Sequence, residues 1–207
     1  MGKKGRVVVI TGVPGTGKTS IAAEISKNTG AKIISINDLV VQQGLYSEVD
    51  VSDGAKIVLM PKLEKAIKKE VARSAGGKAA KGADVHGDAG IVIVDGHLAC
   101  EIKMKADLVL VCRCHPDKLR KRLNARGYNE GKVKANVLSE MLDYCTLQCE
   151  RNFPKANIFE VDTSDKSAQV CAKYALLALA DKKKAAKKRE NVNWADLLFA
   201  QEVNFRS

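Results

Sequence analysis

Eight consecutive residues near the start of the chain have the composition and spacing of a phosphate-binding loop. Residues 12–19 read GVPGTGKT, a complete G-x-x-x-x-G-K-[ST] pattern that follows an apolar run and precedes helical spacing. Glycines let successive backbone N–H groups surround a phosphate chain, and Lys18 is placed to neutralise its β and γ oxygens. The hydroxyl of Thr19 is a suitable ligand for Mg²⁺. The pattern therefore predicts a site for a nucleoside triphosphate with magnesium.

A second candidate lies where a later apolar run, IVIV, ends in Asp95. A carboxylate at the end of a strand beside the phosphate loop is the expected place of a Walker B residue, which holds the Mg²⁺ shell through water. An aspartate at a strand end can also cap a turn, and the residues leave that alternative open. His97 follows on the same edge and could orient a water or a phosphate.

A third, basic stretch contains four arginines: Arg113, Arg120, Arg122 and Arg126. An arginine that closes over phosphates stabilises charge in the transition state of phosphoryl transfer. Arg122 and Arg126 are four residues apart, so we expect them on one face of a helix. Gly127 ends that helix and offers a hinge for closure. For Arg120 and the neighbouring lysines a solvated surface role is the better interpretation.

Hydrophobic patterning predicts the elements that position these residues. Short apolar runs have the composition of strands buried on both faces, at 6–11, 32–36, 91–94, 106–112 and 157–161. Helical spacing follows the loop up to Gly30 and recurs at 37–44, 61–74, 116–126, 130–152 and 166–188. This alternation predicts an α/β fold of the P-loop NTPase type, with a five-stranded parallel sheet flanked by helices and right-handed crossovers.

The connections and the chain end are predicted from their turn-forming and charged residues. Either Asn37 or Asp38 can cap the short helix after the second strand. Residues 45–54 predict an exposed, turn-rich loop, and residues 74–90, rich in glycine and alanine, predict a mobile connection. The basic run 182–189 is expected to be the frayed end of the last helix.

We expect one kinase-like domain over residues 1–190 and a C-terminal extension over 191–207. The extension contains a short apolar patch, formed by Trp194, Leu197, Leu198 and Phe199. This patch can dock back on the core or bind something else, and the residues leave both alternatives open.

Composition places the chain among globular proteins of one or two domains. The 207 residues are 45% hydrophobic and 29% charged, and no apolar stretch is long enough to cross a bilayer. We find no secretory signal at the start, so the six cysteines predict reduced thiols and a cytoplasmic location, or also a nuclear one in a eukaryotic source. Their spacing does not favour a zinc site.

The charge balance favours polyanionic partners. Lysine and arginine number 35 against 24 acidic residues, which gives a net charge of +11, and the sequence pI is about 9.4. A nucleotide pocket needs few cations, so the surplus is more natural for a protein that also meets RNA. A solvated lysine-rich surface explains the same excess equally well.

Taken in order, the segments GVPGTGKTS, NDL, LYSEVD, VDGH and RKRLNARGYNEGKVKANV resemble the adenylate kinase isoenzyme 6 family. Its members are small P-loop kinases and ATPases linked to assembly of the small ribosomal subunit. The run ADLVLVCRCHP is similar to archaeal members, and the resemblance covers about residues 6–180. The D-x-H pair and the RL-x-x-RGY pattern are its more specific parts.

The resemblance implies a nucleoside monophosphate kinase-like fold, with a monophosphate lobe at about 37–59 and a short lid at about 121–131. It implies adenylate kinase activity, ATP and AMP giving two ADP, together with ATP hydrolysis. Implied partners are a small-subunit ribosomal protein and rRNA, and we expect a monomer without membrane association. The residues implied to bind ATP and magnesium are Gly15, Gly17, Lys18, Thr19 and Ser20.

The resemblance also implies catalytic roles for residues beyond the loop. Lys18 and Asp95 would act together with His97, which hydrolysis or transfer would need, and Thr19 and Asp95 would hold Mg²⁺. Arg122 would be the lid arginine on ATP, with Arg126 as its catalytic companion.

Two departures from the family pattern weaken the expected AMP site. Val41, with Gln42 and Gln43 beside it, stands where eukaryotic relatives carry a basic residue, and Met60 stands where an acidic residue is usual. Three functions therefore remain open: an AMP kinase, an ATP-driven ribosome assembly factor with little AMP kinase activity, and a small-metabolite kinase of the shikimate or gluconate type.

Overall fold

The protein is described here by a computed structural model, which covers residues 5–51, 54–75, 90–154, 156–188, 190 and 192–198. Most of the glycine- and alanine-rich connection at 74–90, and Phe199 with the residues after it, lie outside these described residues. Within the described part, no helix is both long enough and apolar enough to cross a bilayer. The six cysteines all fall inside it, are buried and form no disulfide.

A five-stranded parallel sheet forms the centre of the described residues, in the order β2-β5-β1-β6-β7. Its strands are β1 (Arg6–Thr11), β2 (Lys32–Ser35), β5 (Ile91–Asp95), β6 (Leu108–Arg113) and β7 (Asn157–Asp162). The central strand β1 pairs with β5 on one side and with β6 on the other. The carboxyl ends of parallel strands meet at one edge, so the loop after β1 lies between the ends of β5 and β6.

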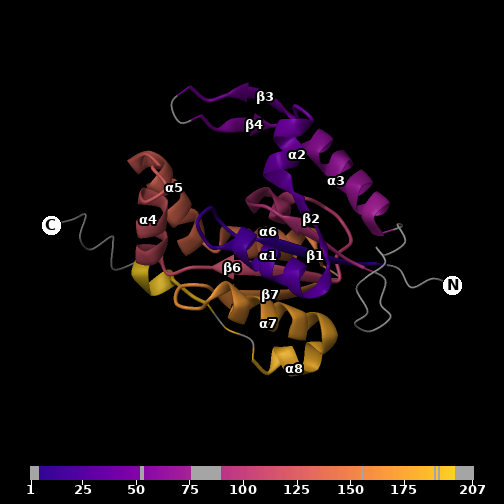
Figure 1. Cartoon of the computed structure of the whole chain (residues 1–207). Helices are drawn as coiled ribbons and strands as arrows, with labels where there is room; N and C mark the ends of the chain where they lie inside the picture. The colour runs from indigo at the N-terminus through magenta and orange to yellow at the C-terminus, as the bar shows by residue number, and fades with distance from the viewer. Residues whose placement is uncertain are drawn as a thin grey trace.

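Helices cover both faces of this sheet, as Figure 1 shows. On one face lie α1 (Lys18–Thr29), α7 (Ala168–Ala180) and α8 (Lys182–Ala186). The opposite core includes α2 (Ile36–Gln42), α3 (Met60–Ala75), α4 (Pro116–Asn124), α5 (Glu130–Met141) and α6 (Tyr144–Asn152). A 3₁₀ helix, η1 (His97–Glu101), follows β5. The fold class predicted from hydrophobic patterning is confirmed.

Gly30 and Ser35 explain where α1 ends and where α2 begins. Gly30 ends α1 in a left-handed conformation, with φ of 68°, and its N–H donates to the Ser26 carbonyl at 2.8 Å, as the sequence predicted. The predicted cap of the second helix was wrong, because Ser35 Oγ accepts from the Asp38 N–H at 3.3 Å. The helix therefore starts at Ile36, before both predicted caps, and Asn37 and Asp38 lie inside its first turn.

The exposed loop predicted at 45–54 contains a strand among its described residues. This strand, β3 (Tyr46–Val49), pairs antiparallel with β4 (Lys56–Val58) in a hairpin that rises beside α2 in Figure 1. The side chains of β3 are mostly exposed, so they lack the buried alternation that marks a strand in a sequence.

Two helices predicted as continuous are interrupted. The stretch 130–152 breaks between α5 and α6, where Asp143 takes a left-handed φ of 53°. The stretch 166–188 breaks at Asp181, whose Oδ1 accepts from the Lys184 N–H at 2.9 Å and begins α8. Neither break carries the glycine or proline that usually signals a helix end, so hydrophobic spacing alone did not reveal them.

The apolar patch of the C-terminal extension docks back on the core in its described part. Trp194, Leu197 and Leu198 pack against the core cluster on the α5 side of the sheet. The Trp194 Nε1 donates to Glu140 Oε1 at 3.2 Å, and its ring meets His115 edge to face at 5.2 Å. Of the two alternatives for this patch, packing on the core is the one observed.

Candidate active site

The phosphate loop joins the end of β1 to the start of α1. Gly15 has a φ of 93°, and a Cβ there would come within 2.9 Å of Leu119 Cδ1 on α4, so the loop packs closely against that helix. Gly17 has a φ of 86° and nothing within 4 Å of an added Cβ, which leaves open space above the loop. Thr16 holds the loop's curve because its buried Oγ1 donates to the Val13 carbonyl at 2.9 Å. Contacts at Gly15 and Thr16 therefore fix the loop, while the space next to Gly17 is open.

Lys18 is buried beneath this space. Its side chain turns into the loop, where Nζ donates to the Val13 carbonyl at 2.8 Å. Burial lowers the pKa of this ammonium, the nearby Asp95 carboxylate raises it, and the positive charge of Arg126 lowers it further. The ammonium is thus removed from water and bound to a neutral carbonyl, an arrangement that an anion above the loop would relieve.

Thr19 and Asp95 come together from different elements. Thr19 Oγ1, in the first turn of α1, donates to Asp95 Oδ2 at 2.8 Å. The other oxygen, Oδ1, is buried and accepts no hydrogen bond from any described residue. Burial raises the pKa of the Asp95 carboxyl, while Thr19 and Lys18 lower it. An unpartnered buried carboxylate oxygen beside a threonine hydroxyl fits the water shell of Mg²⁺.

A metal ion at this place would need ligands beyond the protein. Among the described residues, no group of three or more histidine, cysteine, aspartate or glutamate side chains could hold one. Magnesium commonly binds through one or two protein oxygens together with water and substrate phosphates. The donor set of Thr19 and Asp95 therefore fits a metal that arrives with a nucleotide.

His97 begins η1 directly after the close contact between Gly96 and Ile36. A Cβ on Gly96 would lie 2.7 Å from Ile36 Cβ, so this turn packs tightly on α2. The backbone carbonyl of His97 accepts from Thr11 Oγ1 at 3.1 Å, which ties η1 to the end of β1. Burial, followed by the charges of Lys18 and Lys132, lowers the pKa of the imidazole to about 4. His97 is therefore neutral at pH 7.

Arg122 and Arg126 do not share a helix face, contrary to the expectation from their spacing. The helix α4 ends at Asn124, and Arg126 lies in the turn that follows. Arg122 Nη2 donates to the carbonyls of Thr163 and Ser164, at 2.8 and 3.1 Å, after β7. Arg126 is exposed, and its charge reaches Lys18.

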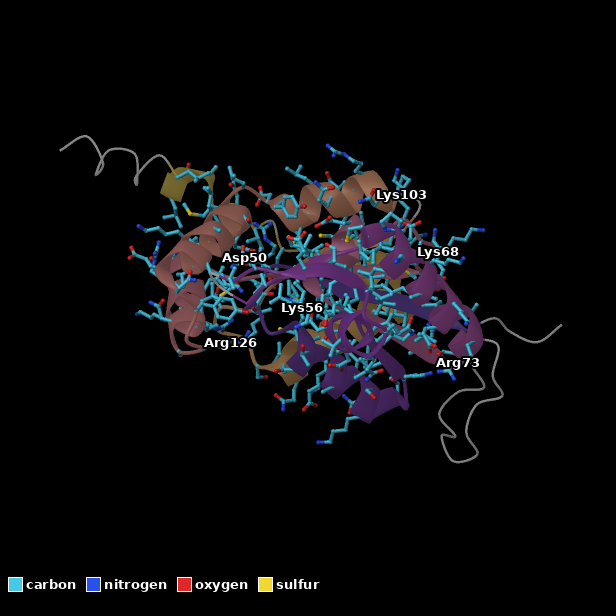
Figure 2. All side chains as sticks on the ribbon, turned by 90° about the horizontal axis from the view of Figure 1, so that it is seen from above. Asp50, Lys56, Lys68, Arg73, Lys103 and Arg126 are labelled. Carbon is cyan, nitrogen blue, oxygen red and sulfur yellow. The ribbon has the colours of Figure 1, made fainter. Side chains whose placement is uncertain are left out.

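Figure 2 shows Arg126 on the side of the molecule formed by α4 and α5, with Lys56 on the hairpin. The two arginines, which we expected on one helix face, thus lie in different surroundings. Arg122 is held by the loop after β7, and Arg126 is on the side of the phosphate loop.

Arg113 is separate from the phosphate site. It is 1% exposed and makes ion pairs with three carboxylates, those of Glu140, Asp143 and Glu160. Its Nε donates to Glu140 Oε1 at 2.8 Å, and the same oxygen accepts from the Cys114 N–H at 3.0 Å. Burial opposes the charge of Arg113, but the carboxylates raise its pKa. Arg113 was grouped by sequence with the arginines of the basic stretch around α4, but the structure places it in this buried cluster of carboxylates.

The predicted monophosphate lobe presents polar and apolar groups to solvent. Val41 is 56% exposed on α2, and Lys56 Nζ lies 5.5 Å from the centroid of the Tyr46 ring in the hairpin. Met60 begins α3 and packs partly against the core. Asp38, in the first turn of α2, is close enough for its charge to raise the pKa of Asp95.

One charged residue near this site was not predicted from the sequence. Lys132, in α5, lies close enough to His97 for its charge to lower the pKa of that imidazole. Its Nζ is 5.0 Å from the centroid of the Tyr128 ring. The segment RGYNEGK contains both residues, an aromatic ring and a lysine four positions apart, and that spacing is the signal that could have indicated them.

Comparison with known proteins shows which families the chain resembles. Residues 8–143 match the family model described as "AAA domain". A protein of Methanosarcina mazei named "Putative adenylate kinase" is 35% identical over 165 residues, which are 79% of this chain and 81% of the relative. A protein of the same name from Methanocaldococcus jannaschii is 29% identical over 93% of this chain and 94% of its own.

A solved structure shares the fold at low sequence identity. Shikimate kinase from Acinetobacter baumannii, in complex with shikimate, is 12% identical, with a TM-score of 0.57, over 86% of this chain and 95% of that one. At this identity the likeness concerns the arrangement of the sheet and helices.

Proposed function

The chain belongs to the AAA domain family and to the archaeal small P-loop kinases that include the Methanosarcina mazei relative, and from that premise we propose that it transfers the γ-phosphoryl group of ATP to AMP. Membership makes it a phosphotransferase, and a nucleoside monophosphate is the acceptor class that its relatives' name supports. Hydrolysis of ATP is the accompanying activity that we propose when water takes the acceptor's place.

One observation carries the proposal. Asp95 has one oxygen bound to the Thr19 hydroxyl and the other buried without a described partner, at the end of the strand next to the phosphate loop. Leaving a buried carboxylate oxygen unpaired costs free energy, about 1–3 kcal/mol for a polar group and more for a charged one. A metal–nucleotide complex would satisfy that oxygen through a water ligand, and no packing role explains its orientation as well.

In this proposal the other site residues contact different parts of the nucleotide. Lys18 would leave the Val13 carbonyl for the β and γ oxygens, and Gly15, Gly17 and Ser20 would line the phosphate chain. Arg122, held at the loop after β7, would bind ATP, while Arg126 would approach the phosphates. When bound through Thr19 and Asp95, Mg²⁺ would neutralise charge on the β and γ phosphates.

Neutral His97 fits the positioning of the reacting groups. At pH 7 its imidazole carries one N–H donor and one acceptor nitrogen, because burial keeps its pKa near 4. It can therefore hold an attacking water in the hydrolysis reaction, or a phosphate oxygen in the transfer reaction, without adding a positive charge of its own.

The test is an assay of the purified full-length chain with Mg-ATP alone, with AMP, with other nucleoside monophosphates and with shikimate or gluconate. We expect ADP formation that a monophosphate stimulates above the rate with Mg-ATP alone, and that falls by about a hundredfold or more in Asp95→Asn. Asp165→Asn is the matched control, because Asp165 is 81% exposed and pairs only on the surface with Lys118. Transfer to shikimate or gluconate in preference to every monophosphate would contradict the proposal.

A second candidate is an ATPase that assists small ribosomal subunit assembly with little AMP kinase activity. The observations that favour it are the exposed Val41 on a helix without basic residues, and the net charge of +11. In this candidate the exposed lysines of α8, Lys182, Lys183 and Lys184, would bind rRNA phosphates.

Binding of structured rRNA at several salt concentrations tests the second candidate. Deleting residues 182–207 would also remove Trp194, which packs on Glu140 and the core. Replacing Lys182, Lys183 and Lys184 by glutamine keeps that packing and removes three charges. We expect the affinity to depend less steeply on salt, by about one unit of slope for each phosphate that the lysines no longer bind. An identical slope would assign any RNA binding to the rest of the molecule.

A further inference from the structure

A buried hydroxyl after β7 reaches across the edge of the sheet to the phosphate loop. Thr163 directly follows β7 and is 4% exposed. Its Oγ1 lies 2.9 Å from the carbonyl oxygen of Thr16, in the loop, and 2.8 Å from that of Arg113, at the end of β6. Because β6 lies between β1 and β7, this one side chain connects the loop after β1 to the ends of both other strands.

The carbonyl of Thr16 depends on this hydroxyl more than the carbonyl of Arg113 does. The Arg113 carbonyl also accepts the backbone N–H of Thr163, at 2.9 Å, so the hydroxyl hydrogen can be given to Thr16. Thr16 is fully buried, and a buried carbonyl that loses its donor pays the cost of leaving water. Thr163 Oγ1 therefore holds the Thr16 carbonyl in one direction.

The direction of this carbonyl sets the direction of the N–H that follows it. The peptide bond between Thr16 and Gly17 is trans, and in a planar trans peptide the C=O and the N–H point opposite ways. With the carbonyl turned toward Thr163, the Gly17 N–H points away from it. Gly17 is the residue directly before α1, with open space next to it. Backbone N–H groups at the start of a helix are donors for phosphate oxygens.

We propose that Thr163 is a positioning residue for the phosphate chain of the nucleotide, an inference that rests on the proposed function. It holds the Thr16 carbonyl, and through that peptide it aims the Gly17 N–H at a phosphate oxygen. This N–H binds the phosphate chain both before and during transfer, so its alignment stabilises the two states alike. Its loss is therefore expected in the affinity for the nucleotide rather than in the rate of the bound complex.

The side chain and the backbone of Thr163 can be tested separately. Arg122 Nη2 donates to the Thr163 carbonyl at 2.8 Å, whereas Arg122 Nη1 is 3.4 Å from Thr163 Oγ1. Thr163→Val keeps the carbonyl and the branched shape and removes only Oγ1, so Arg122 keeps its shorter hydrogen bond. Thr163→Ser restores the hydroxyl. A change found in the valine variant alone is thus attributable to the loss of the hydroxyl.

Thr29, at the far end of α1, provides a matched control. Its Oγ1 donates to the Ile25 carbonyl at 2.7 Å and accepts from the Ala31 N–H at 3.2 Å. Thr29→Val therefore removes a threonine hydroxyl bound to a backbone carbonyl, as Thr163→Val does, but away from the phosphate loop.

The kinetic experiment compares the full-length parent with Thr163→Val, Thr163→Ser and Thr29→Val. We expect Thr163→Val to raise KM for Mg-ATP by about tenfold, with kcat within about threefold of the parent. Thr163→Ser should bring KM back to within about threefold of the parent, and Thr29→Val should behave as the parent. An unchanged KM in Thr163→Val, a loss confined to kcat, or an equal rise of KM in Thr29→Val would overturn the proposal.

Binding of tripolyphosphate with magnesium separates this inference from the choice of acceptor. This probe has the phosphate chain without a base, and its binding needs no turnover. We expect Thr163→Val to weaken its binding by about tenfold and Thr29→Val to leave it unchanged. If no monophosphate is phosphorylated but this selective loss is found, the proposed function fails and the role of Thr163 stands. Equal affinities in the parent and in Thr163→Val would reject Thr163 even in an active kinase.

A measurement on the parent protein tests the same geometry should Thr163→Val fail to fold. In an NMR titration with tripolyphosphate and magnesium, the amide proton of Gly17 should move downfield as it donates to a phosphate oxygen. The Gly30 amide, which donates to the Ser26 carbonyl at 2.8 Å at the other end of α1, should stay in place. A Gly17 amide that does not move at saturation, or a parent protein that does not bind the probe, would overturn the proposal.

Discussion

Two clusters of charge lie at the carboxyl edge of the sheet, and they are built in opposite ways. Around Arg113 a single buried cation is surrounded by Glu140, Asp143 and Glu160, and the guanidinium makes hydrogen bonds to all three. At the phosphate loop the buried Lys18 ammonium donates to the neutral Val13 carbonyl, and Asp95 keeps one oxygen without a described partner. The first cluster satisfies its hydrogen bonds within the protein, whereas the second leaves charge for a ligand.

The difference indicates a structural role for the charged residues of the first cluster and a ligand-binding role for those of the second. A buried ion pair with complete hydrogen bonds joins distant elements, here β6, β7 and the junction of α5 with α6. An incomplete cluster costs stability in the free protein, and natural proteins accept such costs where a ligand removes them. Charged residues of one type can therefore be assigned to a structural or a ligand-binding role according to whether their hydrogen-bond partners lie within the protein.

The largest effect is expected from Arg113→Met, which would break the complete cluster. Removing the cation leaves three carboxylates facing one another, and breaking a buried pair costs about 3–5 kcal/mol of unfolding free energy. Urea denaturation followed by circular dichroism measures the loss. Lys118→Met is the control, because its pair with Asp165 is exposed and is expected to contribute less than about 1 kcal/mol. A cost for Arg113→Met as small as that of the control would contradict the comparison.

Lys18→Met should act in the opposite direction on stability and function. Burial disfavours the charge of Lys18, so we expect the unfolding free energy to stay the same or to rise. The rate of phosphoryl transfer should fall by about a hundredfold to a thousandfold, because a preorganised charge on the phosphates is removed. Lys27→Met, an exposed lysine in the last turn of the same helix, is the control and should leave both quantities unchanged. Loss of stability with normal turnover would show that Lys18 stabilises the fold and does not act on the phosphates.

The pH dependence of unfolding tests the burial of His97. Its pKa is about 4 in the folded protein against 6.5 for the free side chain, so the unfolded state binds more protons between these values. The stabilising contribution is complete above pH 6.5 and is lost as pH falls toward 4, by up to about 3 kcal/mol. We expect His97→Gln to be less sensitive than the parent over this range. Parallel curves for the two proteins would show that the imidazole is solvated.

His97→Ala should lower turnover much more than ATP affinity. Its proposed task is to position reacting groups, and such groups contribute about a hundredfold or more. Steady-state kinetics with and without AMP separates kcat from KM. A large rise in KM with normal kcat would instead make His97 a nucleotide-binding residue.

The smallest effect is expected from Trp194→Phe. Glu140 Oε1 loses the Trp194 donor but keeps those of Arg113 and Cys114, so the cost should be about 1 kcal/mol. Thermal unfolding followed by circular dichroism measures it, and turnover should stay within about twofold of the parent. A cost equal to that of Arg113→Met would mean that the C-terminal patch, rather than the ion pairs, holds the cluster together.

Local sequence determined the parts of this protein that depend on neighbours in the chain. The apolar strand, the glycine turn and the following helix specify the phosphate loop within 24 residues, from Arg6 to Thr29. The alternation of strands and helices likewise predicted the sheet, because burial on two faces leaves a continuous apolar pattern. The positions of Asp95 and His97 at the active edge followed from the same rule.

Only the tertiary structure decided which charges are satisfied. Arg113 finds Glu140 and Glu160 at separations of 27 and 47 residues, and nothing in its neighbourhood distinguishes it from Arg122. The end of α4 at Asn124 moves Arg126 off the expected helix face, and the fold brings Lys132 of α5 close to His97. Coulomb and desolvation energies depend on distance and burial in space rather than on separation along the chain, so a sequence shows which charges exist but leaves their pairing to the fold.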